Sequence, residues 1–329
     1  MAEPKTKNKD KVARNNTVHI VGYLAEDNLE VVTKPDGSRA IRGSLVIATS
    51  DVNRHKVQFY ANEFNTNHEE NKDFKALEAL LPQNVISIAS YLKSTTGASF
   101  ETAANASAKV WVMARFEEFA SRVGEIEKSM ILLKGFRAGF KQATDSSPFD
   151  PRATFKVDVY INALTPDTDE NGEETGKLRV EGLVPVYDDS VYKITFVAYA
   201  DDNAAKYVSE NYAVKDTVTL DGDLTSLVVK KENTNEGGWG RASAPQYETR
   251  FVRERRIVGG SKKPLEGESA ITTAFIKNAL VLRDTKMAEN GKKSQNRHYA
   301  AKATNEVVKE AAPAQTAAKD SVNVDEVDF

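Results

Sequence analysis

The sequence predicts a mainly β protein built from two copies of one small barrel, and three observations support this fold class. Apolar and polar residues alternate in short runs over most of the chain, which is typical of half-buried strands. The same order of runs occurs twice, on either side of a turn-rich segment at 145–152. At 329 residues, the chain is long enough for two domains with separate cores.

The first copy covers residues 17–142 and contains three strands, a helix and two further strands. The first three strands are TVHIVGYL, IRGSLVIA and HKVQFYA, in which alternate apolar residues fall on one face. The helical spacing of Phe74, Leu77 and Leu81 predicts the helix. The runs KVWVMARFEEF and SMILLKGFRAGF complete the copy, and we expect Trp111 in the first of them to lie in the core.

The second copy repeats this order from Thr154 onward. When residues 17–62 are moved forward by 137 positions, TVHIVGYL falls on TFKVDVYI and HKVQFYA falls on YKITFVA without a gap. Residues that face the core in the first copy fall on residues that face the core in the second, as Phe59 falls on Phe196. A shift of the alignment by one residue would place all of these apolar residues on the solvent face. Three strands, a helix and two strands is the order of the five-stranded OB barrel, so we predict two tandem OB folds.

The other segments flank the two barrels. We expect residues 1–16 to form a basic flexible arm and residues 143–153 to form a linker. The second barrel, with a helix at its C-terminal end, is predicted at 154–289. Residues 290–329 are rich in Lys, Ala, Gln and Ser, so we expect a disordered linker that leads to an acidic tail.

Composition limits the functional classes. The chain has no cysteine, which excludes disulfides, thiolate metal sites and a cysteine nucleophile. The start of the chain lacks the apolar segment of a signal peptide, and no run approaches eighteen apolar residues. We therefore expect a soluble intracellular protein with no membrane contact.

Metal binding and catalysis find little support in the sequence. The stretch DTDENG at 167–172 matches the first half of an EF-hand calcium loop, but Leu178 occupies the position of the closing glutamate. We expect an exposed acidic loop there and no metal or cofactor. The motifs HExxH, GxSxG and GxxxxGK[ST] are absent, so we predict a protein without catalytic activity. The alternative is an enzyme that uses a pair of carboxylates, because a single sequence does not reveal such a pair.

The strongest functional signal is the stretch WGRASAPQYETRFVRERR, in which arginines alternate with aromatic residues. Guanidinium groups bind phosphates and aromatic rings stack on bases, as single-stranded nucleic acid requires. The predicted binding residues of this stretch are Trp239, Arg241, Tyr247, Arg250, Phe251, Arg253, Arg255 and Arg256. The alternative is a solvated strand face on which Phe251 and Val252 contribute to the core.

The first barrel supplies further candidates on its outward face and in its first loop. These residues are Lys34, Arg39, Arg42, Lys56 and Tyr60, and Lys193 falls on Lys56 in the repeat. Tyr60 either stacks on a base or covers the edge of the barrel.

The barrel order, the basic and aromatic face and an acidic tail that ends in Phe together resemble the bacterial and phage single-stranded DNA-binding proteins. The resemblance implies that the tail recruits replication, recombination and repair partners through Asp325, Glu326, Asp328 and Phe329. The tail lacks the Ile-Pro that commonly precedes the last Phe in that family. Two barrels in one chain also differ from the usual single-barrel bacterial subunit, which favours a phage protein acting in the cytoplasm of its bacterial host.

We therefore predict a phage-type protein that binds single-stranded DNA without sequence specificity and protects exposed strands. Self-association stays open. A single-stranded RNA-binding protein or chaperone is one alternative, because the same surface can stack on either polymer. A β-barrel structural protein of a virion is another, which would explain the repeat but not the tail.

Overall fold

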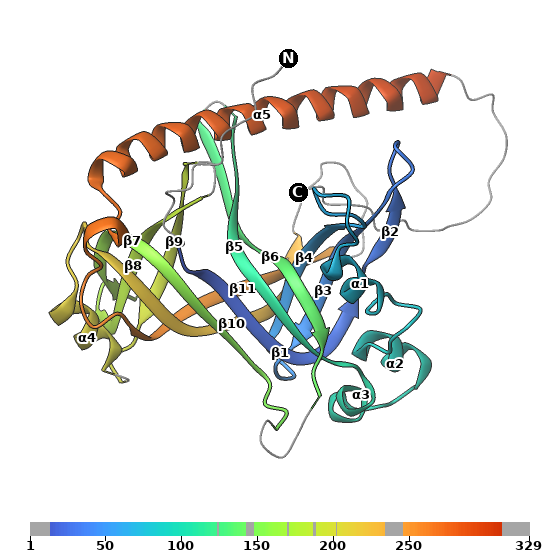
Figure 1. Cartoon of the computed structure of the whole chain (residues 1–329), viewed down its shortest axis with the longest axis horizontal. Coiled ribbons are helices and arrows are strands. Elements are labelled where there is room, and N and C mark those ends of the chain that lie inside the picture. Colours follow the sequence, from blue (N-terminus) through green and yellow to red (C-terminus); the bar gives the residue numbers. More distant parts are fainter. Residues whose placement is uncertain are drawn as a thin grey trace.

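The computed structural model describes residues 14–123, 125–142, 148–169, 171–186, 189–201, 203–233 and 246–310. The fold is mainly β, with one eleven-stranded sheet that closes into two barrels side by side (Figure 1). The first barrel contains β1 (Asn16–Asp27), β2 (Glu30–Thr33), β3 (Arg39–Ala48), β4 (Arg54–Asn62), β5 (Lys109–Val123) and β6 (Ile126–Phe140). The second contains β7 (Arg152–Thr168), β8 (Glu174–Pro185), β9 (Val191–Ala198), β10 (Thr217–Asn233) and β11 (Gln246–Gly260).

Both barrels have the strand order of the OB fold. The first closes in the order β1-β3-β4-β6-β5-β1, and only its β4–β6 contact is parallel. The second closes in the equivalent order β7-β8-β9-β11-β10-β7, again with one parallel contact, between β9 and β11. The prediction of two tandem OB barrels is confirmed.

The internal repeat also holds at the level of strand register. Ile41 pairs with Ala61 between β3 and β4, and Leu178 pairs with Ala198 between β8 and β9 at the same offset of 137 residues. The repeat-related Phe59 and Phe196 are both buried in the core, where apolar side chains contribute most to stability. Trp111, in contrast, is half-buried beside Gly139 on β6 and lies outside the core, contrary to our expectation.

Three short helices separate β4 from β5, where the sequence predicted one. The predicted helix is α1 (Lys72–Glu78), whose N-terminus is capped by Asn71, because this side chain accepts a hydrogen bond from the backbone of Asp73. The helices α2 (Ile88–Ser94) and α3 (Phe100–Ala106) were not predicted, and each begins after a capping serine. In the second barrel the equivalent connection contains only α4 (Ala204–Asn211).

Helices cover the same outward patch on both barrels. In the first barrel, α2 and α3 pack on Val46 of β3 and on the half-buried Tyr23 of β1. The repeat-related residues of the second barrel, Leu183 and Tyr160, are covered by the long helix α5 (Thr273–Glu310), which follows a 3-10 turn at Gly267–Ser269. Each barrel therefore loses this part of its outer face as a binding surface.

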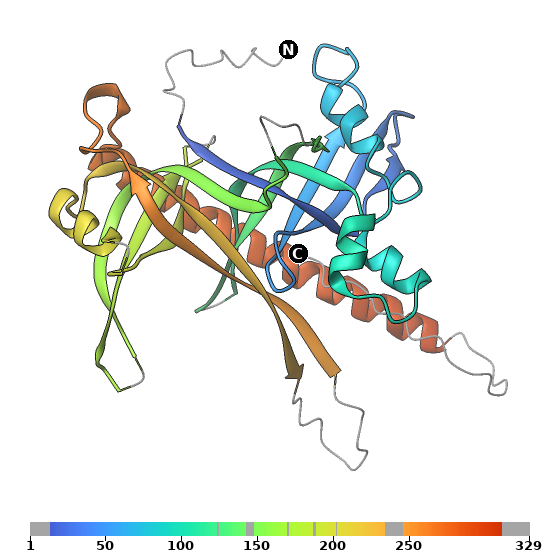
Figure 2. The same cartoon turned by 90° about the horizontal axis from the view of Figure 1, so that it is seen from below.

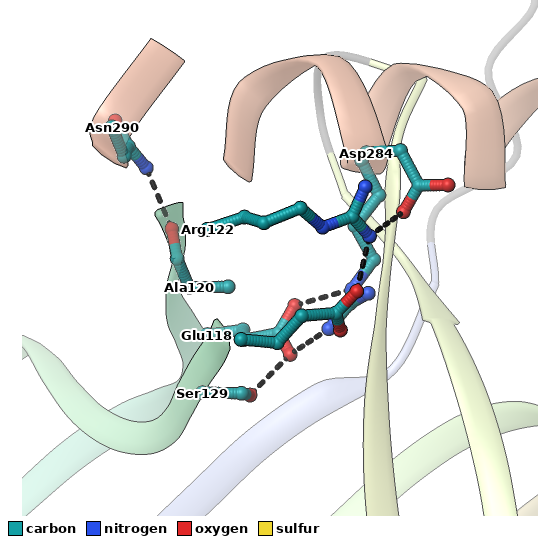
Figure 3. A network of polar contacts seen from close by, with 8 residues as sticks. Glu118, Ala120, Arg122, Ser129, Asp284 and Asn290 are labelled. Carbon is teal, nitrogen blue, oxygen red and sulfur yellow. Dashed lines mark hydrogen bonds and ion pairs between the residues drawn. The ribbon is translucent and has the colours of Figure 1, made fainter. Parts of the chain in front are cut away.

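Helix α5 also connects the two barrels, because it continues from the second barrel onto β5 of the first (Figure 1). Arg283 forms two hydrogen bonds of 2.6 and 2.8 Å with Glu118, and the two side chains are only 9% and 5% exposed. Around Glu118, Ser129 donates to its carboxylate and Asn290 donates to the carbonyl of Ala120 (Figure 3). These contacts fix α5 against the β5–β6 hairpin.

A mid-helix glycine allows this close approach of α5 to β5. A Cβ atom at Gly291 would lie 1.8 Å from the carbonyl oxygen of Arg122. The helix continues to Glu310, whereas the sequence predicted a disordered linker from residue 290. Residues 311–329 lie outside the described part of the chain.

At the end of the predicted flexible arm, Arg14 donates to the carbonyl oxygens of Ser269 and Ala270. Asn15 donates to the carboxylate of Asp158. Residues 1–13 lie outside the described part of the chain. Strand β6 ends at Phe140 and β7 begins at Arg152, so the connection between the barrels falls two residues earlier than the predicted linker at 143–153. The domain boundaries 17–142 and 154–289 remain predictions.

Two sets of strand contacts join the barrels. Strands β1 and β7 pair in an antiparallel manner, with Val18 opposite Phe155. The hairpin of β10 and β11 extends beyond the second barrel (Figure 2) and contacts β4 of the first. Leu227 forms a β-bridge there with Asn53, just before β4. Within the described residues, no helix is long and apolar enough to cross a membrane.

Candidate nucleic-acid interface

A pocket on the first barrel combines aromatic rings with positive charge. Tyr60 lies on the outward face of β4 and is 55% exposed, and Phe136 on the neighbouring β6 is 38% exposed. Arg115 and Lys134 line the same pocket. Both cations share one carboxylate, that of Glu117, at 3.4 and 3.2 Å, so this group carries a net positive charge. The pocket can therefore accept a stacked base beside its phosphate.

The parallel pairing of β4 with β6 creates this pocket. Gln58 lies opposite Lys134 in the register, which brings Tyr60 next to the outward residues of β6. Asp73 of α1 also lines the pocket, but Arg137 lies 3.5 Å from its carboxylate and reduces its repulsion of a phosphate. The sequence predicted Tyr60 but missed Phe136, Lys134 and Arg115, because their proximity depends on strand pairing.

The second barrel holds a different cluster, centred on Tyr199 just beyond β9. The Lys177 ammonium lies 4.5 Å and the Arg256 guanidinium 4.8 Å from the centre of the Tyr199 ring. The hydroxyl of Tyr199 donates to Glu254 at 2.6 Å, and this hydrogen bond is the main reason why the pKa of Tyr199 is raised. Tyr199 thus positions two cations on the outer face of the second barrel. Neither Tyr199 nor Lys177 was predicted.

The other predicted cations of the first barrel are mostly neutralised. Arg39 forms ion pairs with Glu63 at 2.7 Å and Glu78 at 3.2 Å, and Arg42 lies 2.6 Å from Glu30. Lys34 lies in the turn between β2 and β3, away from the residues that line the Tyr60 pocket. A strand that bound at Arg39 or Arg42 would have to displace these carboxylates.

Two of the predicted arginines, Arg253 and Arg255, face the first barrel. The sequence predicted that they would contact phosphates on an exposed strand face. Arg253 donates to the carbonyl oxygens of Lys56 on β4 and Ile131 on β6, at 3.1 and 3.0 Å. Arg255 lies 5.3 Å from the centre of the Phe116 ring and donates to the carbonyl of Thr195 on β9 at 3.4 Å. We call this contact region of β11 with β4, β6 and β9 the seam.

Both seam arginines are partly buried. Burial lowers the pKa of Arg253 and that of Arg255 to about 10, and the charge of Arg253 contributes to the shift of Arg255. Each remains protonated at neutral pH. Lys56 and Lys193 stand on the outward faces of β4 and β9, on either side of the seam, and neither forms an ion pair with a described residue.

The remaining predicted residues have no described side chain. Tyr247, Arg250 and Phe251 lie on β11, whereas Trp239 and Arg241 fall outside the described residues, as do Asp325, Glu326, Asp328 and Phe329.

The stretch that resembles a calcium loop forms the β7–β8 turn. The carboxylate of Asp169 accepts hydrogen bonds from the backbone of Asn171 and Glu173, and that of Asp167 accepts one from Arg179 at 2.5 Å. These bonds lower the pKa values of both aspartates. Among the residues that the structure describes, no group of three or more His, Asp or Glu side chains gathers in a way that could hold a metal ion.

Comparison with known proteins gives one family and several similar structures. A family model described as YorF matches residues 14–294. Two structures of the single-stranded DNA-binding protein from Thermus aquaticus are similar, a deletion variant at 14% identity and the wild type at 12%. Their TM-scores are 0.43 and 0.42, and the matches cover 78% and 80% of this chain and 98% and 99% of those chains.

A chain of a replication protein A heterotrimer bound to single-stranded DNA is 10% identical, with a TM-score of 0.18. That match covers 77% of this chain and 52% of the other. No curated protein matches.

Proposed function

The chain belongs to the YorF family, and we propose that it is a non-catalytic protein that binds single-stranded DNA with little sequence preference. Fold alone does not determine function, so the proposal depends on the surface residues. The observation that supports it most is the pocket of Tyr60 and Phe136 with Arg115 and Lys134 at its edge. In an OB fold, the face of strands 2 and 3 binds oligonucleotides. Tyr60 lies on β4, the third strand of the closed first barrel.

The chemistry of the pocket favours a single strand over a duplex. Exposed rings can stack on bases only when the bases are free of their neighbours, whereas the bases of a duplex are already stacked and paired. The nearby cations contact phosphates, which every sequence presents. Binding should therefore be tolerant of sequence and sensitive to salt.

The test is a comparison of oligo-dT with a duplex of the same length, by fluorescence anisotropy over a range of salt. We expect much tighter binding of oligo-dT, with a steep loss of affinity between about 50 and 200 mM salt, because each phosphate contact releases condensed counterions. Equal affinities for the two forms of DNA would contradict the proposal. An oligo-U of the same length, measured alongside, tests the RNA alternative, which tighter binding of RNA would favour.

We further propose that the acidic segment at 320–329 recruits replication, recombination and repair proteins of a bacterial host to the bound strand. The support is the sequence itself, which offers Phe329 as an apolar anchor and Asp325, Glu326 and Asp328 as charges for a basic-rimmed pocket. The two barrels in one chain favour a phage protein.

The tail can be tested by substitution. We expect Phe329→Ala to lose binding of host replication proteins in a pull-down while DNA affinity stays unchanged, because only the apolar anchor is removed. Deletion of 320–329 should abolish the same pull-down and leave DNA affinity equal or somewhat higher at low salt, because an acidic segment competes with phosphates. Retention of all partners by the deleted protein would contradict this role.

A further inference from the structure

The two seam arginines lack the carboxylate partner that most of the other described arginines have. Arg253 and Arg255 have no carboxylate within ion-pairing distance in the described structure, and their hydrogen bonds go to backbone carbonyls. Eight other arginines are paired with carboxylates, namely Arg39, Arg42, Arg115, Arg122, Arg137, Arg152, Arg179 and Arg283. Arg14 also donates to two backbone carbonyls, and Arg54 lies over the ring of Phe100. A desolvated charge without a counterion is costly, so this arrangement requires an explanation.

Several donor and acceptor atoms at the seam also lack partners. The Nε atoms of Arg253 and Arg255 are buried without a hydrogen-bond partner among the described residues. The same holds for Nδ1 of His55 on β4 and for Oγ of Ser226 on β10, which lies opposite Arg253 in the β10–β11 register. Burial and the charge of Arg253 lower the pKa of His55 to about 4, so this side chain is neutral and adds no further positive charge. The seam is therefore a cationic region whose charge no described carboxylate balances.

The position of the seam connects the two candidate binding regions. Arg253 contacts the backbone of Lys56, and Tyr60 lies two outward positions further along β4. Arg255 contacts the backbone of Thr195, and Tyr199 lies four residues further along the chain, just beyond the end of β9. A strand that passed from one aromatic region to the other would meet the seam on its way.

We propose that the seam binds a backbone phosphate of a single strand that crosses from one barrel to the other, so that the two barrels present one continuous site. The inference rests on the proposed function and adds the path of the strand. The phosphate supplies the negative charge that the protein does not supply, and charge-assisted hydrogen bonds to guanidinium groups are the strong kind. A strand that occupied only one barrel would leave the seam arginines unbalanced.

Arg255 gives the cleaner test, because it forms a single long hydrogen bond whereas Arg253 forms two good ones. The variant is Arg255→Gln. The matched control is Arg152→Gln, an exposed arginine that Asp150 neutralises at 2.7 Å. Affinity is measured for oligo-dT of about 30 and about 10 nucleotides, since one OB fold covers about 4–16 nucleotides.

For the long oligonucleotide, we expect Arg255→Gln to weaken binding about tenfold and to reduce the slope of log K against log salt by about 0.7, as the loss of one phosphate contact predicts. The short oligonucleotide should be held nearly as well as by the unmodified protein. Arg255→Lys should restore most of the slope, and Arg152→Gln should change neither quantity.

Two results would overturn the inference. One is an unchanged salt slope together with a lowered unfolding midpoint, because Arg255 would then only hold the barrels together. The other is an equal loss of affinity for the short and long oligonucleotides, because the seam would then lie off the path between barrels. Failure of the proposed function is distinct, since the unmodified protein would then show no preference for single strands.

Discussion

Replacement of Arg283 by methionine is expected to lower the free energy of unfolding by about 3–5 kcal/mol, because it leaves a buried carboxylate without its partner. Glu118 is 5% exposed, and Arg283 provides two of its three hydrogen bonds. Ser129 cannot neutralise the remaining charge. Denaturant unfolding of the whole chain measures the loss, with an unchanged m-value as evidence that the unfolded state is the same.

Two further variants test whether the loss of stability comes from the buried ion pair. Asp284→Asn removes the neighbouring ion pair with Arg122, which is more exposed at 31% and 53%, and should cost less than about 1 kcal/mol. The double variant Arg283→Met with Glu118→Leu removes both charges and should recover most of the lost stability. If the double variant is as unstable as the single one, the packing of α5 and not the ion pair determines the effect.

Substitution Tyr60→Ala is expected to weaken single-strand binding by about 1–3 kcal/mol, the range for loss of one base-stacking ring. The side chain is 55% exposed and lies outside the core, so the unfolding midpoint should stay nearly constant. Anisotropy titration with oligo-dT measures the loss of affinity. Because stacking needs the ring and not the hydroxyl, Tyr60→Phe should bind like the unmodified protein.

The control for this prediction is another exposed aromatic residue on the same sheet. Phe140 on β6 is 48% exposed and does not line the Tyr60 pocket, so Phe140→Ala should retain full affinity. An equal loss in both variants would indicate a general effect of surface apolarity. An unchanged affinity in Tyr60→Ala would mean that Tyr60 covers the barrel edge and that the strand binds elsewhere.

The barrels could be predicted because alternation and repetition are properties of the sequence. Phe59 and Phe196 recur at the same offset, and both are buried. The helices α2 and α3 could not be predicted in this way, because they show little periodicity, unlike α1 of the same length, which buries both Phe74 and Leu77. The structure shows what these helices do: they cover an outward apolar patch that includes Val46 and Tyr23.

The site was less predictable, because its residues come together through pairing between distant strands. Alternation places Tyr60 on the outside of β4, but only the parallel register with β6 brings Phe136 beside it. Similarly, the sequence shows that Arg253 and Arg255 share one side of a strand. It does not show that the other barrel lies on that side, where it accepts the hydrogen bonds of Arg253 and places Phe116 beside Arg255.

The pairing of Glu118 with Arg283 also affects the order in which parts of the chain can fold during synthesis. The two residues are 165 positions apart. At a synthesis rate of about 5–20 residues per second, Arg283 is therefore added roughly ten to thirty seconds after Glu118. During that interval the β5–β6 hairpin cannot bury Glu118 without a large desolvation cost. The first barrel is synthesised first, but we expect it to reach its final state only after the helix encoded near the end of the described chain has emerged.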